Sequence, residues 1–180
     1  MKDFRRIALF ALLIGAVPFF TQSGVVLNFV MTALYACLLS QAWNVLGGFG
    51  GQFSFGHALF FGTGAYVQVM AQIHLGCNPW FALLLASGMS AIVGLCVGAL
   101  SFRYGLKGSY FALVTLAFAE VFRIFALSVA FTGAGVGLML PLHESFSNMQ
   151  FSSRAGYVWL VLGLVTLALC TTAWLQHSRF

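Results

Sequence analysis

The sequence predicts an all-α protein, a polytopic transmembrane helix bundle of about six spans with a glycine-rich break between spans 2 and 3. Composition is the first observation. The 180 residues are 61% hydrophobic and only 6% charged, whereas a soluble domain carries about a quarter charged residues. Apolar runs of helical length recur along the chain, and a dense cluster of glycines interrupts the series. These features predict an integral membrane protein.

The apolar runs predict the spans in order, and all but the first approach the ~20 residues that a bilayer core requires. The first run contains Pro18 and has the length of a signal-peptide core. Because no small-residue cleavage site follows it, we expect a retained first helix. Asn78-Pro79 marks the turn before the fourth span. The expected spans are residues 7–20, 25–46, 57–75, 80–101, 109–130 and 157–175.

Lysine and arginine residues near the span ends predict the orientation, because cytoplasmic loops carry an excess of both. With the N-terminus in the cytoplasm, the opposite side receives only Arg154, and Arg123 lies within a span. The cytoplasmic side then receives Lys2, Arg5, Arg6, Arg103, Lys107 and Arg179. The bias predicts six spans with both termini inside. It also accounts for the net charge of +5, so we expect no nucleic-acid partner.

Residues 41–66 (QAWNVLGGFGGQFSFGHALFFGTGAY) hold seven of the 20 glycines. A glycine run breaks a helix, because glycine loses the most backbone entropy on ordering. At membrane depth, irregular backbone persists only where protein or a water-filled cavity satisfies its polar groups, and broken polar segments indicate transport pathways. A short packing loop between two helices is the alternative. The candidate pathway residues are Asn44, Gly50, Gly51, Gln52, Ser54, His57 and Thr63.

Two charged residues lie inside the fifth expected span. Glu120 and Arg123 are three residues apart, so they share a helix face. Glu120 lies ~16 Å along the axis from Ser109, near the bilayer middle. An acidic residue there costs roughly 2.5–3.5 kcal/mol and normally faces a bundle or cavity. Glu120 is therefore a candidate pathway residue, an ion-pair partner of Arg123 that holds helices in register, or both.

Enzyme and metal motifs are not found in the sequence. It contains no phosphate-binding loop and no HExxH pattern, and its four histidines are scattered. We therefore expect no catalytic residue and no metal site. A remote alternative is an intramembrane serine hydrolase, because Ser54 lies between glycines. Such an enzyme needs a base from another span, and His57 is only three residues away.

Two motifs, WNVLGGFGGQFSFGHALFFGTGAY at residues 43–66 and GSYFALVTLAFAEVFRI at residues 108–124, resemble permease subunits of ABC importers for branched-chain amino acids. The resemblance covers about residues 27–180. It implies one transmembrane permease domain over residues 1–180, located in the cell inner membrane and carrying leucine, isoleucine or valine. Related permeases carry urea or short amides, which are the alternative substrates.

The same resemblance implies partners. They are a second related permease, two cytoplasmic ATPase subunits that hydrolyse ATP, and a periplasmic substrate-binding protein; this chain itself would bind no cofactor. Permeases of this family are longer, and they continue beyond a segment like residues 178–180 with a basic cytoplasmic stretch and further spans. We therefore expect the domain to be incomplete at its C-terminus.

Overall fold

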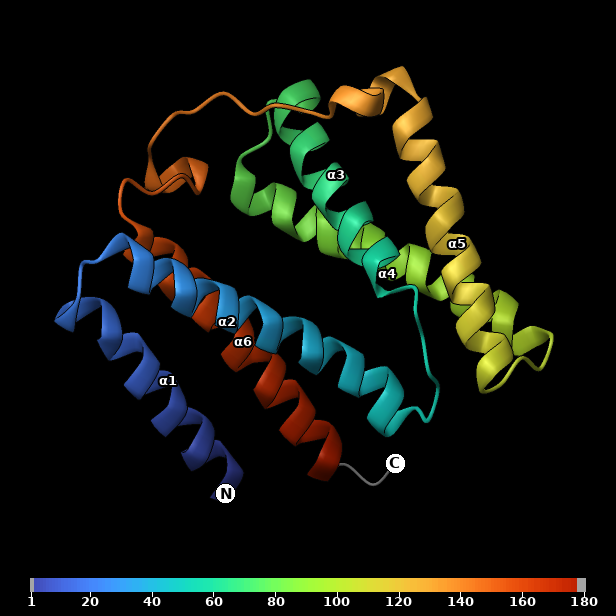
Figure 1. Cartoon of the computed structure of the whole chain (residues 1–180), viewed down its shortest axis with the longest axis horizontal. Coiled ribbons are helices and arrows are strands. Elements are labelled where there is room, and N and C mark those ends of the chain that lie inside the picture. The colour runs from blue at the N-terminus through green and yellow to red at the C-terminus, as the bar shows by residue number, and fades with distance from the viewer. Residues whose placement is uncertain (1, 178–180) are drawn as a thin grey trace. The chain divides into compact units, whose positions relative to one another are not determined.

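The computed structural model describes residues 2–177, which contain six α-helices (Figure 1). Their bounds are α1 Lys2–Phe20, α2 Gly24–Asn44, α3 His57–Leu75, α4 Pro79–Arg103, α5 Ser109–Ser128 and α6 Arg154–His177. A π-helical turn, Val45–Phe49, follows α2, and three 3-10 turns lie between α5 and α6 at Ala130–Thr132, Ala134–Val136 and Phe146–Asn148. Within the described residues the β-structure is a single bridge between Ser145 and Gln150. The predicted all-α class is confirmed.

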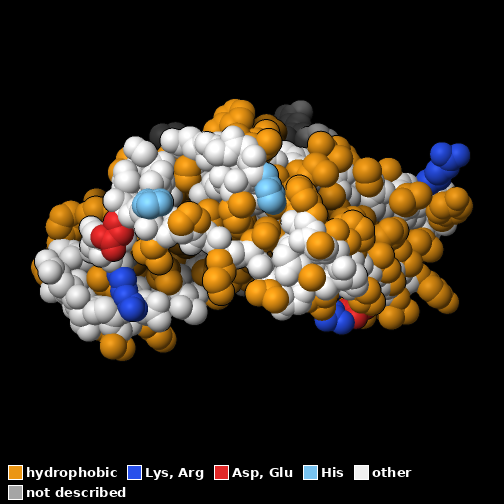
Figure 2. Space-filling model, turned by 90° about the horizontal axis from the view of Figure 1, so that it is seen from above, with side chains coloured by type: hydrophobic (Ala, Val, Ile, Leu, Met, Phe, Trp, Pro, Cys, Tyr) orange, Lys and Arg blue, Asp and Glu red, His pale blue; other side chains and the backbone are white. Residues whose placement is uncertain are grey.

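Four segments of the described chain are long and apolar enough to cross a membrane: Gly24–Phe49, Pro79–Arg103, Ser109–Ser128 and Arg154–His177. The protein is therefore a multi-pass membrane protein. The helices α1 and α3, which the sequence predicts as spans, are outside this set. Both helices contain charged or polar residues: the first turns of α1 are rich in charged residues, and α3 carries two glutamines and two histidines. Figure 2 shows hydrophobic side chains spread across the face drawn, with few charged ones.

The chain forms two compact units. The first comprises residues 1–49 and 151–180, in which α6 contacts both α1 and α2 (Figure 1). Its core is aliphatic and comes from two of these helices: Leu27 and Leu34 of α2 pack with Val158, Leu162 and Val165 of α6.

Hydrogen bonds at both ends show that α2 and α6 run parallel. Near their first residues, Arg154 Nη1 donates to the carbonyl oxygen of Gly24 (3.1 Å), and near their last turns Thr172 Oγ1 donates to Gln41 Oε1 (3.3 Å). The helix α1 runs antiparallel to α6. Trp159 Nε1 donates to the carbonyl oxygen of Gly15 (3.2 Å), while Asp3 Oδ2 lies 3.6 Å from His177 Nε2 at the opposite end.

The second unit comprises residues 50–150 and contains α3, α4 and α5. A tight turn joins α3 to α4: Gly76 adopts a left-handed conformation (φ 60°), and Asn78 caps α4 by accepting a hydrogen bond from Trp80 N (2.9 Å). Leu59, Val93 and Val97 form the buried core between these two helices. The helix α5 contacts both α3 and α4.

Candidate functional site

The backbone leaves helical conformation at residues 50–56, inside the glycine-rich stretch. The π-helical turn Val45–Phe49 precedes this break, and π-helical turns occur frequently at functional sites. Gly51 has φ 61°, a left-handed conformation that glycine adopts without steric cost. Gly50 and Gly51 are both exposed in the described chain. Local backbone requirements therefore account for glycine at position 51.

The break packs against the flank of α5. Phe55 N donates a hydrogen bond to Thr115 Oγ1 (3.2 Å), and Gly56 N donates to Ser54 Oγ (3.2 Å). A Cβ atom on Gly56 would lie 2.6 Å from the carbonyl oxygen of Thr115, so the two backbones meet at a distance that only glycine allows. Ser54 is 2% exposed. Its hydroxyl group satisfies irregular backbone, as buried polar groups generally do.

The other predicted residues of the stretch have separate surroundings. Gln52 Oε1 accepts a hydrogen bond from Gly108 N (3.3 Å), which connects the break to the residue before α5. His57 packs edge-on against Phe60, and its buried Nδ1 has no hydrogen-bond partner among the described residues. Asn44 belongs to the other compact unit, where its side chain lies against Gly48.

A cavity of about 500 Å³ lies between α3 and α5, within the second unit. Of the predicted pathway residues, Thr63 and Glu120 line it, and Arg123 lines it as well. The remaining wall is mainly aliphatic and aromatic. Residues that the sequence reasoning missed include Phe55, Gly62, Tyr66, Met70 and Phe122. Those on α3 recur every three or four residues, and this helical periodicity is the signal that could have identified them.

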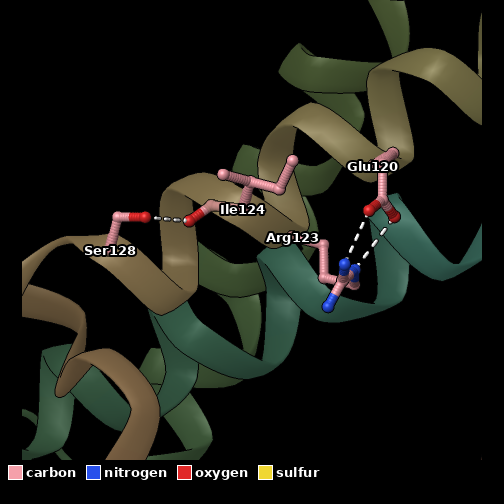
Figure 3. Close-up of polar contacts among 4 residues, drawn as sticks. All are labelled: Glu120, Arg123, Ile124 and Ser128. Atoms are coloured by element: carbon pink, nitrogen blue, oxygen red, sulfur yellow. Dashed lines mark hydrogen bonds and ion pairs between the residues drawn. The ribbon is translucent and has the colours of Figure 1, made fainter.

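Glu120 and Arg123 form a two-point ion pair in the cavity wall (Figure 3). Arg123 Nε donates to Glu120 Oε2 (2.9 Å) and Arg123 Nη2 donates to Glu120 Oε1 (2.6 Å). This paired geometry fixes the guanidinium plane as well as its distance. The side chains of Arg123 and Glu120 are 61% and 52% exposed. Both charges therefore face open space in the described chain, on one side of α5.

The cavity thus offers two chemical surfaces. Its apolar walls fit an aliphatic group, and the ion pair presents one charge of each sign. Pockets of this kind bind through apolar burial, while a few polar groups fix the ligand's orientation. Among the residues that the structure describes, no group of three His, Cys, Asp or Glu side chains is placed to hold a metal ion.

Comparisons with known proteins are consistent with a transport role. Residues 25–180 match the family model described as branched-chain amino acid transport system / permease component. The high-affinity branched-chain amino acid transport system permease protein LivM of Escherichia coli (strain K12) is 32% identical over 154 residues, covering 84% of this chain and 36% of that protein. The protein of the same name from Salmonella typhimurium is 33% identical over 151 residues, covering 82% and 35%.

The chain spans about a third of the length of the curated relatives it matches. No solved structure matches it at a significant level. A permease component is a transport subunit and not an enzyme, so the serine-hydrolase alternative is set aside. Since the family model covers far more than half of the sequence, the chain belongs to the branched-chain amino acid transport permease family.

Proposed function

We propose that this chain is a transmembrane permease subunit of an ABC importer and forms part of the pathway for leucine, isoleucine and valine across the cell inner membrane. The family match over residues 25–180 is the observation that carries this proposal. The relatives are named for high-affinity branched-chain amino acid transport. The aliphatic cavity wall favours such substrates over urea or short amides, which have no aliphatic side chain to bury.

In this proposal the chain works with four kinds of partner. A second related permease completes the membrane pathway, two cytoplasmic ATPase subunits hydrolyse ATP, and a periplasmic protein delivers the substrate; the lipid bilayer surrounds the helices. The chain itself binds no cofactor. Residues 1–180 form a single permease domain, of which the two compact units are parts.

Helix directions within the first unit support six crossings, two more than the four candidate spans. The helices α2 and α6 are parallel, so both enter the membrane from the same side. An odd number of crossings must therefore separate them. Because α4 and α5 supply two, α3 supplies the third despite its lower hydropathy.

The helix α1 supplies the sixth crossing. Its contacts with α6 extend from Asp3 beside His177 to Gly15 beside Trp159, so it passes through the same depth as a candidate span. With six crossings, the bias of basic residues places the N-terminus and residues 104–108 in the cytoplasm. Residues 21–23 and the loop between α5 and α6 then lie outside.

The proposed pathway includes Thr63 and Glu120, which line the cavity, together with the break that forms its inner end. Gln52 and Ser54 hold the break through hydrogen bonds, and Gly50 and Gly51 provide its turn. His57 presents a buried nitrogen with no partner among the described residues. Asn44 precedes the break, at the end of α2. Arg123 orients Glu120 as its ion-pair partner.

Uptake measurements test the proposal. The protein as it occurs in the cell, with its partner subunits and binding protein, is assayed with radiolabelled leucine, isoleucine, valine, urea and acetamide. We expect uptake of the three amino acids that disappears when this chain is deleted and returns when it is restored. Uptake of urea or acetamide alone would show that the substrates are amides and not branched-chain amino acids. Unchanged uptake after deletion would reject the transport role.

A further inference from the structure

The loop between α5 and α6, residues 129–153, presents large apolar side chains outward. Val136, Met139 and Leu142 are 80–86% exposed, and they are spaced three residues apart. All three lie outside the candidate spans. Isolated exposed apolar residues are ordinary on a protein surface, but several in one short segment indicate an interaction site.

Two amide side chains of the same loop bond to the loop's own backbone. Gln150 Oε1 accepts a hydrogen bond from His143 N (2.6 Å) and its Nε2 donates to the carbonyl oxygen of Pro141 (3.1 Å). Asn148 Nδ2 donates to the carbonyl oxygen of His143 (3.3 Å). The two amide side chains, which are half-buried, thus supply partners to three backbone groups of the loop. This arrangement fits apolar surroundings, because the backbone needs fewer partners from the solvent.

Side chains in the last turn of α3 and the first turn of α4 contact the loop. Phe131 stacks on His74 in the last turn of α3, with ring centroids 4.8 Å apart. Trp80, in the first turn of α4, donates from Nε1 to the carbonyl oxygen of Phe146 (3.1 Å). Tryptophan at the end of a span is typical of the membrane–water interface. The loop therefore lies beside the last turn of α3 and the first turn of α4.

We propose that the loop between α5 and α6 lies on the membrane surface, with Val136, Met139 and Leu142 inserted among the phospholipid headgroups and upper acyl chains. Apolar burial holds it there. The loop contains no lysine or arginine, so attraction to anionic lipids contributes little and the contact is insensitive to salt. This inference requires only that the candidate spans cross the membrane, and it is independent of the substrate that the protein carries.

Lipid contact is measured on single-cysteine variants of the full chain, with its four native cysteines replaced by alanine. Met139→Cys and Leu142→Cys carry an environment-sensitive NBD fluorophore, and Glu144→Cys is the matched control in the same loop. Each protein is reconstituted into phosphatidylethanolamine–phosphatidylglycerol vesicles, and insertion is verified by flotation. Quenching is then compared between a phospholipid with a nitroxide high on its acyl chain and aqueous iodide.

We expect the nitroxide lipid to quench the probes at positions 139 and 142 severalfold more strongly than the probe at 144, with the opposite order for iodide and no change at high salt. Strong iodide quenching at all three positions would place the loop in water and overturn the proposal. Protection from both quenchers would mean that a protein surface covers it, which also overturns the proposal. Val136→Cys provides a third position if one variant fails to insert.

Discussion

At the scale of single residues, the absence of a side chain has opposite consequences at two glycines of the site. A Cβ on Gly56 would collide with the carbonyl oxygen of Thr115, whereas a Cβ on Gly62 meets no atom within 4 Å. Gly56 therefore sets how closely the break approaches α5. Gly62, on α3, leaves open space in the cavity wall.

This difference predicts opposite effects of the same substitution. Gly56→Ala should destabilise the protein by about 1–3 kcal/mol, because it overpacks a backbone contact that cannot move freely. Gly62→Ala should be neutral or stabilise by up to ~1 kcal/mol, because alanine is the better helix former. Unfolding by sodium dodecyl sulfate in mixed micelles measures both free energies. Equal destabilisation by the two substitutions would contradict the close contact at Gly56.

The ion pair is the other feature at this scale. Glu120→Gln leaves the Arg123 guanidinium without its partner carboxylate, so we expect less protein in the membrane and lower uptake. Adding Arg123→Gln removes the unpaired charge and should restore abundance. Uptake should stay low, because the cavity then lacks both charges. Immunoblots of membranes and uptake of radiolabelled leucine are measured for both single variants and the double variant.

Two outcomes would change this interpretation. If the double variant also regains transport, the pair serves only to hold helices in register. Full transport by the Glu120→Gln single variant would show that the Glu120 carboxylate is needed neither for the pathway nor for holding the helices in register.

At the scale of elements, α3 carries two surfaces. Leu59 packs into the core with α4 and also borders the cavity beside α5, which residues 62, 63, 66 and 70 line as well. Gly64 allows α4 to approach, because a Cβ there would lie 2.9 Å from Ser90 Oγ. Small residues that lower the hydropathy of α3 thus lie beside the cavity (Gly62) and against α4 (Gly64). These surfaces agree with the proposal that α3 is a span.

Filling the cavity from α3 should block transport without unfolding the protein. We expect Gly62→Leu to lower leucine uptake about tenfold or more, equivalent to ~1.4 kcal/mol, at unchanged membrane abundance. Gly88→Leu, in α4, is the matched control: a Cβ there also meets nothing within 4 Å, and the residue does not line the cavity. Normal uptake by the Gly62→Leu variant would show that the cavity is not part of the transport pathway.

At the scale of the whole molecule, the directions of α1, α2 and α6 support the proposed topology. Parallel α2 and α6, with α1 antiparallel to α6, agree with six crossings. They disagree with a chain in which only the four most apolar segments cross. The basic residues near the span ends agree with the same arrangement.

Cysteine labelling checks this topology in intact cells. In a background without native cysteines, Gln22→Cys and Ser145→Cys should react with a membrane-impermeant maleimide. Gly105→Cys should react only after permeabilisation. If the residues at positions 22 and 145 are on opposite sides, α3 does not cross the membrane. Labelling of position 105 alone in intact cells would show that the orientation in the membrane is the opposite of the one proposed.

The membrane class, the helices and the family could all be predicted from the sequence. Each depends on information contained within a local segment: the apolar length of α4 or α6, the glycines at 50–56, and the two motifs at 43–66 and 108–124. It also predicted that Glu120 and Arg123 share a helix face, because their separation is a helical repeat.

Contacts between residues that are distant in the sequence could not be predicted in this way. Three results depend on how the break and α3 pack against α5: Phe55 bonds to Thr115, Gly56 contacts the same residue, and Thr63 and Glu120 line one cavity. Asn44 lies in the other compact unit. The physical reason is that packing is set by side-chain shape across two helices. The hydropathy and residue spacing of one helix do not specify how its side chains fit against those of another helix.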